Sequence, residues 1–220
     1  MSKTIATLKM PFDPDCRRCK RLSDFLDDVQ EKHPDYHARP VEPFGAARAR
    51  FLIVGLAPGM HGANATGRPF TGDYAGILLY ETLHAFGFSN LPVSTHRNDK
   101  LKLKHCRITN AVKSLPPENK PEGGEIAQCN GFLAAELNTL PRPAIILALG
   151  TIAHNAVLKA RGLKLSQYKF GHGAVHKLDA GLTLVDSYHC SRYNTQTKRL
   201  TEKMFHDVFR NITRLLAQDP

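Results

Sequence analysis

Residues 55–73, GLAPGMHGANATGRPFTGD, constrain the fold more than any other segment of this chain. The segment directly follows an apolar run at 50–54, and it holds five glycines and two prolines together with a His, an Asn and an Asp. A buried strand that opens into so long a loop within a compact domain usually builds a functional site. The loop has neither the Gly-Lys-Ser/Thr ending of a P-loop nor a GxGxxG pattern, so nucleotide-triphosphate and dinucleotide sites are disfavoured.

The size and charge of the chain limit its domain count and its partners. Its 220 residues suffice for one well-buried core, so we expect a single domain over 1–220, with a CxxC segment and a first helix within 1–45. The formal net charge of +10 favours a polyanionic partner, of which nucleic acid is the commonest. Charge alone fits a merely soluble basic protein equally well.

The N-terminus and the cysteines indicate the compartment. No apolar run reaches the length of a membrane span, and the N-terminus lacks the apolar core of a signal peptide. We therefore expect a cytoplasmic protein without a membrane partner, and a monomer. Five cysteines in a reducing compartment are not expected to form disulfides, and the pair Cys16 and Cys19 in a basic CxxC indicates metal, cluster or redox chemistry.

The apolar periodicity predicts an α/β fold. Strands are predicted at 50–56, 105–112, 144–149 and 182–187, and helices at 22–32, 76–88, 125–140, 151–160 and 200–217. Thr151 is predicted to cap its helix, and 91–104 to be an exposed crossing. Because nearly continuous apolar strands alternate with helices, we expect a central, mostly parallel sheet flanked by helices.

Polar residues follow three of the predicted strands. In open α/β sheets, ligands bind outside the carboxyl ends of the strands. The residues at these ends are His61, Asn64, Phe70 and Asp73 after the first strand, Thr109 and Asn110 at the second, and the run Tyr188-His189-Cys190-Ser191-Arg192 after the last. Three such ends that carry His, Asn and Asp favour a functional crevice over isolated structural side chains.

This constellation resembles the uracil-DNA glycosylase superfamily. Three segments carry the resemblance: GLAPG at 55–59, HCS at 189–191 where the family usually has His-Pro-Ser, and ITNAVK at 108–113. The whole loop 55–73, with Ala57 where other branches carry a polar catalytic residue, is most similar to the type-5 branch. The resemblance extends from Cys16 to Phe205, and it implies a three-layer α/β sandwich that removes uracil from DNA.

The resemblance also implies roles around the base. Phe70 would hold a flipped-out uracil by its face, and the Asn110 amide would read its edge. Gly55, Ala57 and Gly59 would complete the base-binding wall. The strictest uracil enzymes carry a bulky ring at the Gly59 position, so a glycine there implies tolerance of 5-substituted uracils and of deaminated purines.

Cleavage of the N-glycosidic bond leaves negative charge on the base and positive charge on the sugar. A donor aimed at uracil O2 favours that transition state, and His189 fits this role. Asp73 is the nearest acidic residue in the loop, and we assign it to the sugar cation or the attacking water, with His61 and Asn64 as alternatives. DNA contacts are expected from Ser191, Arg192, Tyr193, Lys198 and Arg199, and from Lys100, Lys102 and Lys104.

Type-4 and type-5 relatives typically hold a [4Fe–4S] cluster on four cysteines. Cys16, Cys19 and Cys129 match three ligand positions, but Ser114 stands at the other one. Cys106 lies eight residues earlier on an extended strand and is a poor substitute, and Cys190 belongs near the active site. A cluster on three thiolates and a hydroxyl, loss of the cluster, and zinc on the same residues are the three alternatives, of which we favour the first.

Two other functions compete with the glycosylase. Ala57 and Ser114 also fit a catalytically inactive nucleic-acid-binding module that kept the fold. A nucleoside hydrolase-like enzyme would use the same crevice on free nucleosides, but such substrates need no cationic surface, so the charge of +10 disfavours it.

Overall fold

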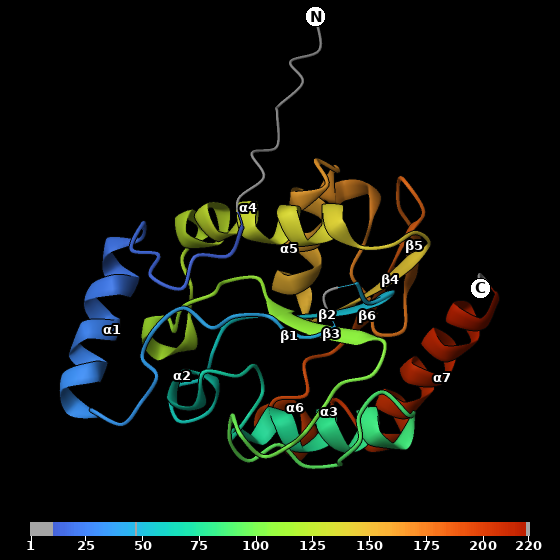
Figure 1. Ribbon diagram of the computed structural model, residues 1–220. Helices are drawn as coiled ribbons and strands as arrows, with labels where there is room; N and C mark the ends of the chain where they lie inside the picture. The colour runs from blue at the N-terminus through green and yellow to red at the C-terminus, as the bar shows by residue number, and fades with distance from the viewer. Residues whose placement is uncertain (1–10, 47, 219–220) are drawn as a thin grey trace, which may run out of the picture.

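A six-stranded sheet with the strand order β1-β3-β2-β4-β6-β5 lies at the centre of the computed structural model, which describes residues 11–46 and 48–218 (Figure 1). The strands are β1 Phe44–Gly45, β2 Phe51–Gly55, β3 Cys106–Asn110, β4 Ala144–Leu149, β5 Val175–Lys177 and β6 Leu182–Ser187. The four inner strands β3, β2, β4 and β6 are parallel, and β1 and β5 pair antiparallel to their neighbours. The predicted fold class is therefore confirmed.

Helices cover both faces of the sheet. They are α1 Lys20–Lys32, α2 Ala63–Thr66, α3 Tyr74–Ala85, α4 Gly123–Thr139, α5 Thr151–Ala160, α6 Arg192–Gln196 and α7 Glu202–Gln218, with 3-10 turns η1 Pro117–Asn119 and η2 Leu165–Gln167. In Figure 1, α4 and α5 lie above the sheet and α3 and α7 below it. None of the helices in the described residues is long and apolar enough to cross a membrane.

The alternation of side chains along the inner strands explains the two helical layers. Phe51 and Ile53 pack into the core with α3 and α7, whereas Leu52 and Val54 pack into the core with α4 and α5. Successive side chains of a strand point to opposite faces, so a strand covered on both faces is apolar at every position. This requirement produces the continuous apolar runs from which the strands were predicted.

Four predicted helix starts differ by two residues from those of α1, α3, α4 and α7, and capping explains the start of α3 and corrects the predicted cap of α5. Thr151 is not the cap of α5: it is the first helical residue, and Gly150, with a φ of 92°, precedes it in a conformation that favours glycine. Helix α3 begins at Tyr74, before the predicted start at residue 76, because the side chain of Asp73 accepts a hydrogen bond from the Gly76 amide.

The segment 91–104 is only partly the exposed crossing that the sequence predicts. Lys100, Lys102 and Lys104 are exposed, but Leu101 is buried and the Asp99 carboxylate is 8% exposed. Asp99 forms an ion pair of 2.5 Å with the buried Arg68 in the glycine-rich loop. The crossing therefore anchors that loop to the body of the protein.

Candidate active site

A cavity of about 520 Å³ opens at the carboxyl ends of the parallel strands. Its walls come from the loop after β2, from Asn110 at the end of β3, from Leu149 and Gly150 after β4, and from His189 after β6. The parallel register aligns these ends, because Gly55 pairs with Asn110 and Leu149 pairs with Ser187. The cavity therefore lies where the sheet topology predicts a ligand.

Gly55 permits the closest approach in the site. A Cβ atom at this position would lie 2.4 Å from Asn110 Oδ1 and 2.6 Å from Phe70 Cζ, so a larger residue would displace these two side chains. The missing side chain allows the Asn110 amide and the Phe70 ring to share one wall of the cavity. Gly55 thus shapes the site by leaving space rather than by contributing a chemical group.

Phe70 is held in an unusual backbone conformation. Its φ is 55°, which is uncommon for an aromatic residue. Three contacts fix its neighbourhood: Tyr80 donates a hydrogen bond of 2.8 Å to the Pro69 carbonyl oxygen, Arg68 Nε donates to Thr71 Oγ1 at 2.9 Å, and the Phe70 carbonyl lies where Gly76 would carry a Cβ. The Phe70 ring consequently faces the His189 ring, at 28° between planes and 6.0 Å between centroids.

Asn110 carries an unsatisfied acceptor. Its side chain is buried, and its Oδ1 atom has no hydrogen-bond partner. A buried acceptor without a partner costs about 1–3 kcal/mol, so such atoms in native proteins call for an explanation. A bound ligand with an N–H group pointing at Oδ1 would satisfy it.

Asp73 has two roles that use different oxygens. Oδ1 accepts a hydrogen bond of 2.9 Å from the Gly76 amide and caps α3. Oδ2 points towards Gly59 and Gly62, where hypothetical Cβ atoms would lie 3.8 and 2.7 Å from it. Burial raises the pKa of Asp73, and hydrogen bonds from the Gly76 and Ala75 amides oppose this shift. The carboxylate is thus positioned by α3 while one oxygen remains directed at the glycine-rich wall.

His189 is a neutral imidazole at the wall of the cavity. Burial lowers its pKa to about 4, so the ring carries no charge at neutral pH. The segment that bears it is fixed, because Asn194 Nδ2 donates a hydrogen bond of 2.8 Å to the His189 carbonyl oxygen and Ser191 caps α6. A neutral imidazole has one N–H group, so it can donate one hydrogen bond to a ligand in the cavity.

Several residues predicted for the site lie elsewhere. The exposed His61 forms a hydrogen bond of 2.7 Å with the Tyr36 hydroxyl, and Asn64 is fully buried with neither amide atom bonded, and neither residue lines the cavity. Arg192 does line it, with its guanidinium 5.3 Å from the centre of the Tyr74 ring, and Tyr193 beside it is 70% exposed. Other residues of the cavity wall carry no motif and were not predicted, among them Tyr74, Asn119 and Ile152.

Comparison with known proteins identifies the family. The sequence profile of the uracil DNA glycosylase superfamily matches residues 42–213. The chain belongs to the uracil-DNA glycosylase superfamily. A type-5 uracil-DNA glycosylase of Thermus thermophilus is 45% identical over 91% of this chain and 93% of its own length, and one of Mycobacterium leprae is 41% identical over 91% of each. A type-4 enzyme of Archaeoglobus fulgidus is 28% identical over 74% of this chain and 69% of its own. The resemblance inferred from the motifs is confirmed.

The cysteines of this superfamily member are all free. Cys129 packs with Leu22 and Val112 in a small apolar cluster that Cys19 and Ala57 also contact. Burial raises the pKa of Cys129 to about 11, and the neighbouring thiols of Cys19 and Cys16 add to this effect. Cys106 instead packs on the α3 and α7 side, where its Sγ lies 3.7 Å from the Phe88 carbonyl oxygen.

These thiols do not form a compact site for a single ion. Among the residues that the structure describes, one group of at least three His, Cys, Asp or Glu has its ligand atoms within 4.8 Å of one another, and it contains no cysteine. Cys19 packs beside Cys129, and Ser114, which the sequence places at the remaining ligand position, is buried. A cubane cluster holds its ligands farther apart than one metal ion does.

We predict that His189 titrates far below an ordinary histidine. Its ring signals in an NMR titration should move with a pKa near 4. Because the unfolded chain takes up this proton near pH 6.5 and the folded chain does not, stability is lost as the pH falls from about 6.5 to 4. Urea unfolding of the wild type and His189→Gln across this range measures the difference, which the variant should lack; a His189 pKa of about 6.5 would contradict the assignment.

Proposed function

We propose that this chain excises uracil from DNA by hydrolysing the N-glycosidic bond, which leaves an abasic site for base excision repair. The type-5 relatives are named as uracil-DNA glycosylases, and they align along nearly the whole chain. One observation carries the proposal: the unsatisfied Asn110 Oδ1 shares a cavity with the Phe70 and His189 rings. Such a wall supplies a stacking face, an amide and a neutral donor, which together suit a pyrimidine base.

Base recognition follows from the hydrogen-bonding groups of uracil. Uracil presents an N3–H donor beside an O4 acceptor, and an asparagine amide offers the complementary acceptor and donor. In the proposed complex, Asn110 Oδ1 accepts from N3–H and its amide nitrogen donates to O4. Phe70 stacks on the face of the base, so the extruded nucleotide regains part of the stacking that it lost in the duplex.

His189 assists the departure of the base. As the glycosidic bond breaks, negative charge develops on uracil O2, and a donor held there stabilises the transition state more than the ground state. The low pKa of His189 makes the imidazole neutral, so it donates a hydrogen bond to the anion and retains its proton. The uracil therefore leaves as a stabilised anion rather than as a protonated base.

Asp73 acts on the sugar side of the bond. Oδ1 is engaged with the Gly76 amide, and Oδ2 is left to orient the attacking water and to stabilise the sugar cation. Ala57 offers neither a charge nor a hydrogen bond, so Asp73 is the acidic group of the cavity wall that can take this role. Water attacks the anomeric carbon, the C–N bond breaks with its electron pair on uracil, and the abasic sugar keeps the hydroxyl group. The proton that the water loses passes to the Asp73 carboxylate and then to solvent, where it balances the charge of the released uracil anion.

The DNA backbone would contact the rim of the cavity. Arg192, at the start of α6, lines the cavity and stacks on Tyr74, and Tyr193 extends into solvent. Arg192 and Ser191 are suited to phosphate, and Tyr193 can occupy the gap that the flipped nucleotide leaves. The net charge of +10 supports binding to DNA. The five free cysteines fit a reducing compartment, and we place the protein in the cytoplasm. We propose that it acts as a monomer.

An oligonucleotide assay tests the proposal. We expect the wild type to release uracil and to create abasic sites that alkali cleaves, and His189→Ala to lower the single-turnover rate by about 10²–10³-fold, as loss of an oxyanion donor does. Asp73→Ala should lower it to a similar extent. His61→Ala is the matched control with a wild-type rate, because His61 lies outside the cavity. Binding without strand scission by the wild type would instead establish an inactive DNA-binding module.

Gly59 predicts the breadth of the substrate range. A Cβ at this position would meet only Asp73 Oδ2, at 3.8 Å, so the wall has room beside the base. We expect the wild type to excise 5-hydroxymethyluracil as well as uracil, and Gly59→Tyr to lower the rate on the 5-substituted base at least about tenfold more than the rate on uracil. Equal strictness of the two proteins towards 5-hydroxymethyluracil would refute this role of Gly59.

A [4Fe–4S] cluster held by Cys16, Cys19 and Cys129, with Ser114 at the remaining position, is the cofactor that we propose. When bound, the iron–sulfur cluster would have a structural role. Cys129 belongs to the small apolar group of side chains that Ala57 of the glycine-rich loop also contacts, so the cluster would connect its cysteines to that loop. Three thiolates would bind three of the four iron ions, and the Ser114 hydroxyl would be a weaker ligand of the fourth. No step of the proposed reaction passes through it.

Iron content tests the cluster. We expect anaerobically purified protein to be brown with substoichiometric iron, Ser114→Cys to raise the iron content, because a thiolate binds iron more strongly than a hydroxyl, and Cys129→Ser to abolish it. Cys106→Ser, on the opposite side of the sheet, is the control that leaves the iron unchanged. A colourless anaerobic wild type would refute retention of the cluster.

A further inference from the structure

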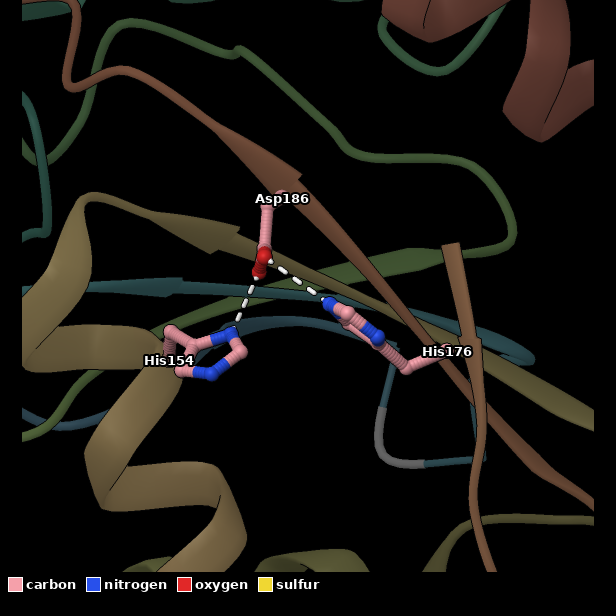
Figure 2. A group of neighbouring side chains, drawn as sticks. All are labelled: His154, His176 and Asp186. Atoms are coloured by element: carbon pink, nitrogen blue, oxygen red, sulfur yellow. Dashed lines mark hydrogen bonds and ion pairs between the residues drawn. The ribbon is translucent and has the colours of Figure 1, made fainter. Parts of the chain in front are cut away.

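A buried group of two histidines and an aspartate lies apart from the proposed reaction. His154 comes from α5, His176 from the edge strand β5 and Asp186 from β6, and the three side chains point towards one another (Figure 2). His154 Nδ1 lies 2.8 Å from Asp186 Oδ1, and His176 Nε2 lies 3.2 Å from Asp186 Oδ2. The side chains of Asp186 and His154 are 0% and 1% exposed, so the buried carboxylate of Asp186 must have a partner.

The outer contacts of this group match those of metal ligands. Histidines that bind metals almost always donate the other ring N–H to a carbonyl or carboxylate, which fixes the tautomer. His154 Nε2 lies 2.9 Å from the Tyr168 carbonyl oxygen, which leaves the Nδ1 lone pair directed at Asp186. The carboxylate is oriented in the same way, because the Gly171 amide donates a hydrogen bond of 3.3 Å to Asp186 Oδ2.

The spacing of the ligand atoms suits one small ion. All three lie within 4.8 Å of one another. Zinc bonds of about 2.0–2.1 Å in a tetrahedron place neighbouring ligand atoms roughly 3.3 Å apart. The separations of 2.8 Å from His154 Nδ1 to Oδ1 and 3.2 Å from His176 Nε2 to Oδ2 are within about 0.5 Å of this value, so small shifts of the side chains would admit the ion.

We propose that His154, His176 and Asp186 bind a divalent transition-metal ion, with zinc as the first choice. Two imidazoles and one carboxylate are typical ligands of zinc and of other first-row divalent ions, and water completes the coordination. The side chain of His176 is 16% exposed, which provides the entry for the ion and the place for the water. The thiols of the proposed cluster take no part in this site.

In the absence of the ion, Asp186 lies within hydrogen-bond distance of both imidazoles and holds the three side chains together. Metal binding requires neutral imidazoles, so it weakens as the pH falls. The bound ion would join the edge strand β5 to α5 and β6, and it would stabilise the fold. Its ligand in β6, Asp186, lies three residues before His189.

The test is zinc titration of the full-length chain after treatment with a chelator. We expect one zinc ion per chain by calorimetry at pH 7.5 in Cys16→Ser/Cys19→Ser, which removes binding at the thiols, and a rise in the melting temperature of this variant with added zinc. His176→Gln should remove both effects, and it should still fold because this side chain lies on the exposed edge strand. Asp186→Asn is the second variant, and His172→Gln, a nearby histidine that stacks on Tyr188 instead, is the matched control with wild-type binding.

Cobalt separates this site from the cysteines. Co²⁺ bound to imidazole and carboxylate gives only weak visible bands, whereas Co²⁺ bound to thiolate adds an intense charge-transfer band in the near ultraviolet. We expect the weak bands to persist in Cys16→Ser/Cys19→Ser, where any thiolate band is lost, and to be absent in His176→Gln. No zinc binding by the wild type, weak cobalt bands that survive in His176→Gln, or weak bands that vanish with Cys16 and Cys19 would each overturn the proposal, the first by leaving a plain hydrogen-bonded cluster.

Discussion

The parallel pairing of β2 with both β3 and β4 is the constraint on which the rest of the site depends. Parallel strands end at the same edge of a sheet. The loop after β2, the amide at the end of β3 and the imidazole after β6 are therefore brought together although they are far apart in the sequence. Gly55 completes this arrangement at the end of β2, because any side chain there would collide with Asn110 and Phe70. Backbone register therefore sets the positions of groups that come from three distant segments.

The polar groups of the protein divide into those satisfied by the fold and those left for a ligand. Arg68 and Asp99 pair with each other in near-complete burial, and they anchor the loop that carries Phe70. Asn110 Oδ1 has no partner, and Oδ1 is the oxygen of Asp73 that accepts the hydrogen bond capping α3. A rigid surrounding that fixes such incompletely satisfied groups lowers the reorganisation needed when the reaction begins, which is how preorganised sites stabilise charge.

Much of this architecture could be predicted from the sequence, for identifiable physical reasons. The central strands β2 and β4 are apolar along their length because both faces are covered, so they stand out as continuous runs. The edge strands β1 and β5 have two and three residues, too few for any periodicity to appear. The loop motif indicated Phe70 and Asp73, but His154, His176 and Asp186 each read as a single polar residue, and only the folded chain brings them together.

The brevity of the outer strands has a consequence for self-association. A sheet edge presents unpaired amide and carbonyl groups that can recruit a strand from another molecule, and a very short edge offers few of them. Here the two-residue β1 and the three-residue β5, which ends in the exposed Lys177, bound the long inner strands on both sides. The parallel core that orders the catalytic groups is thereby shielded from strand-by-strand growth into aggregates.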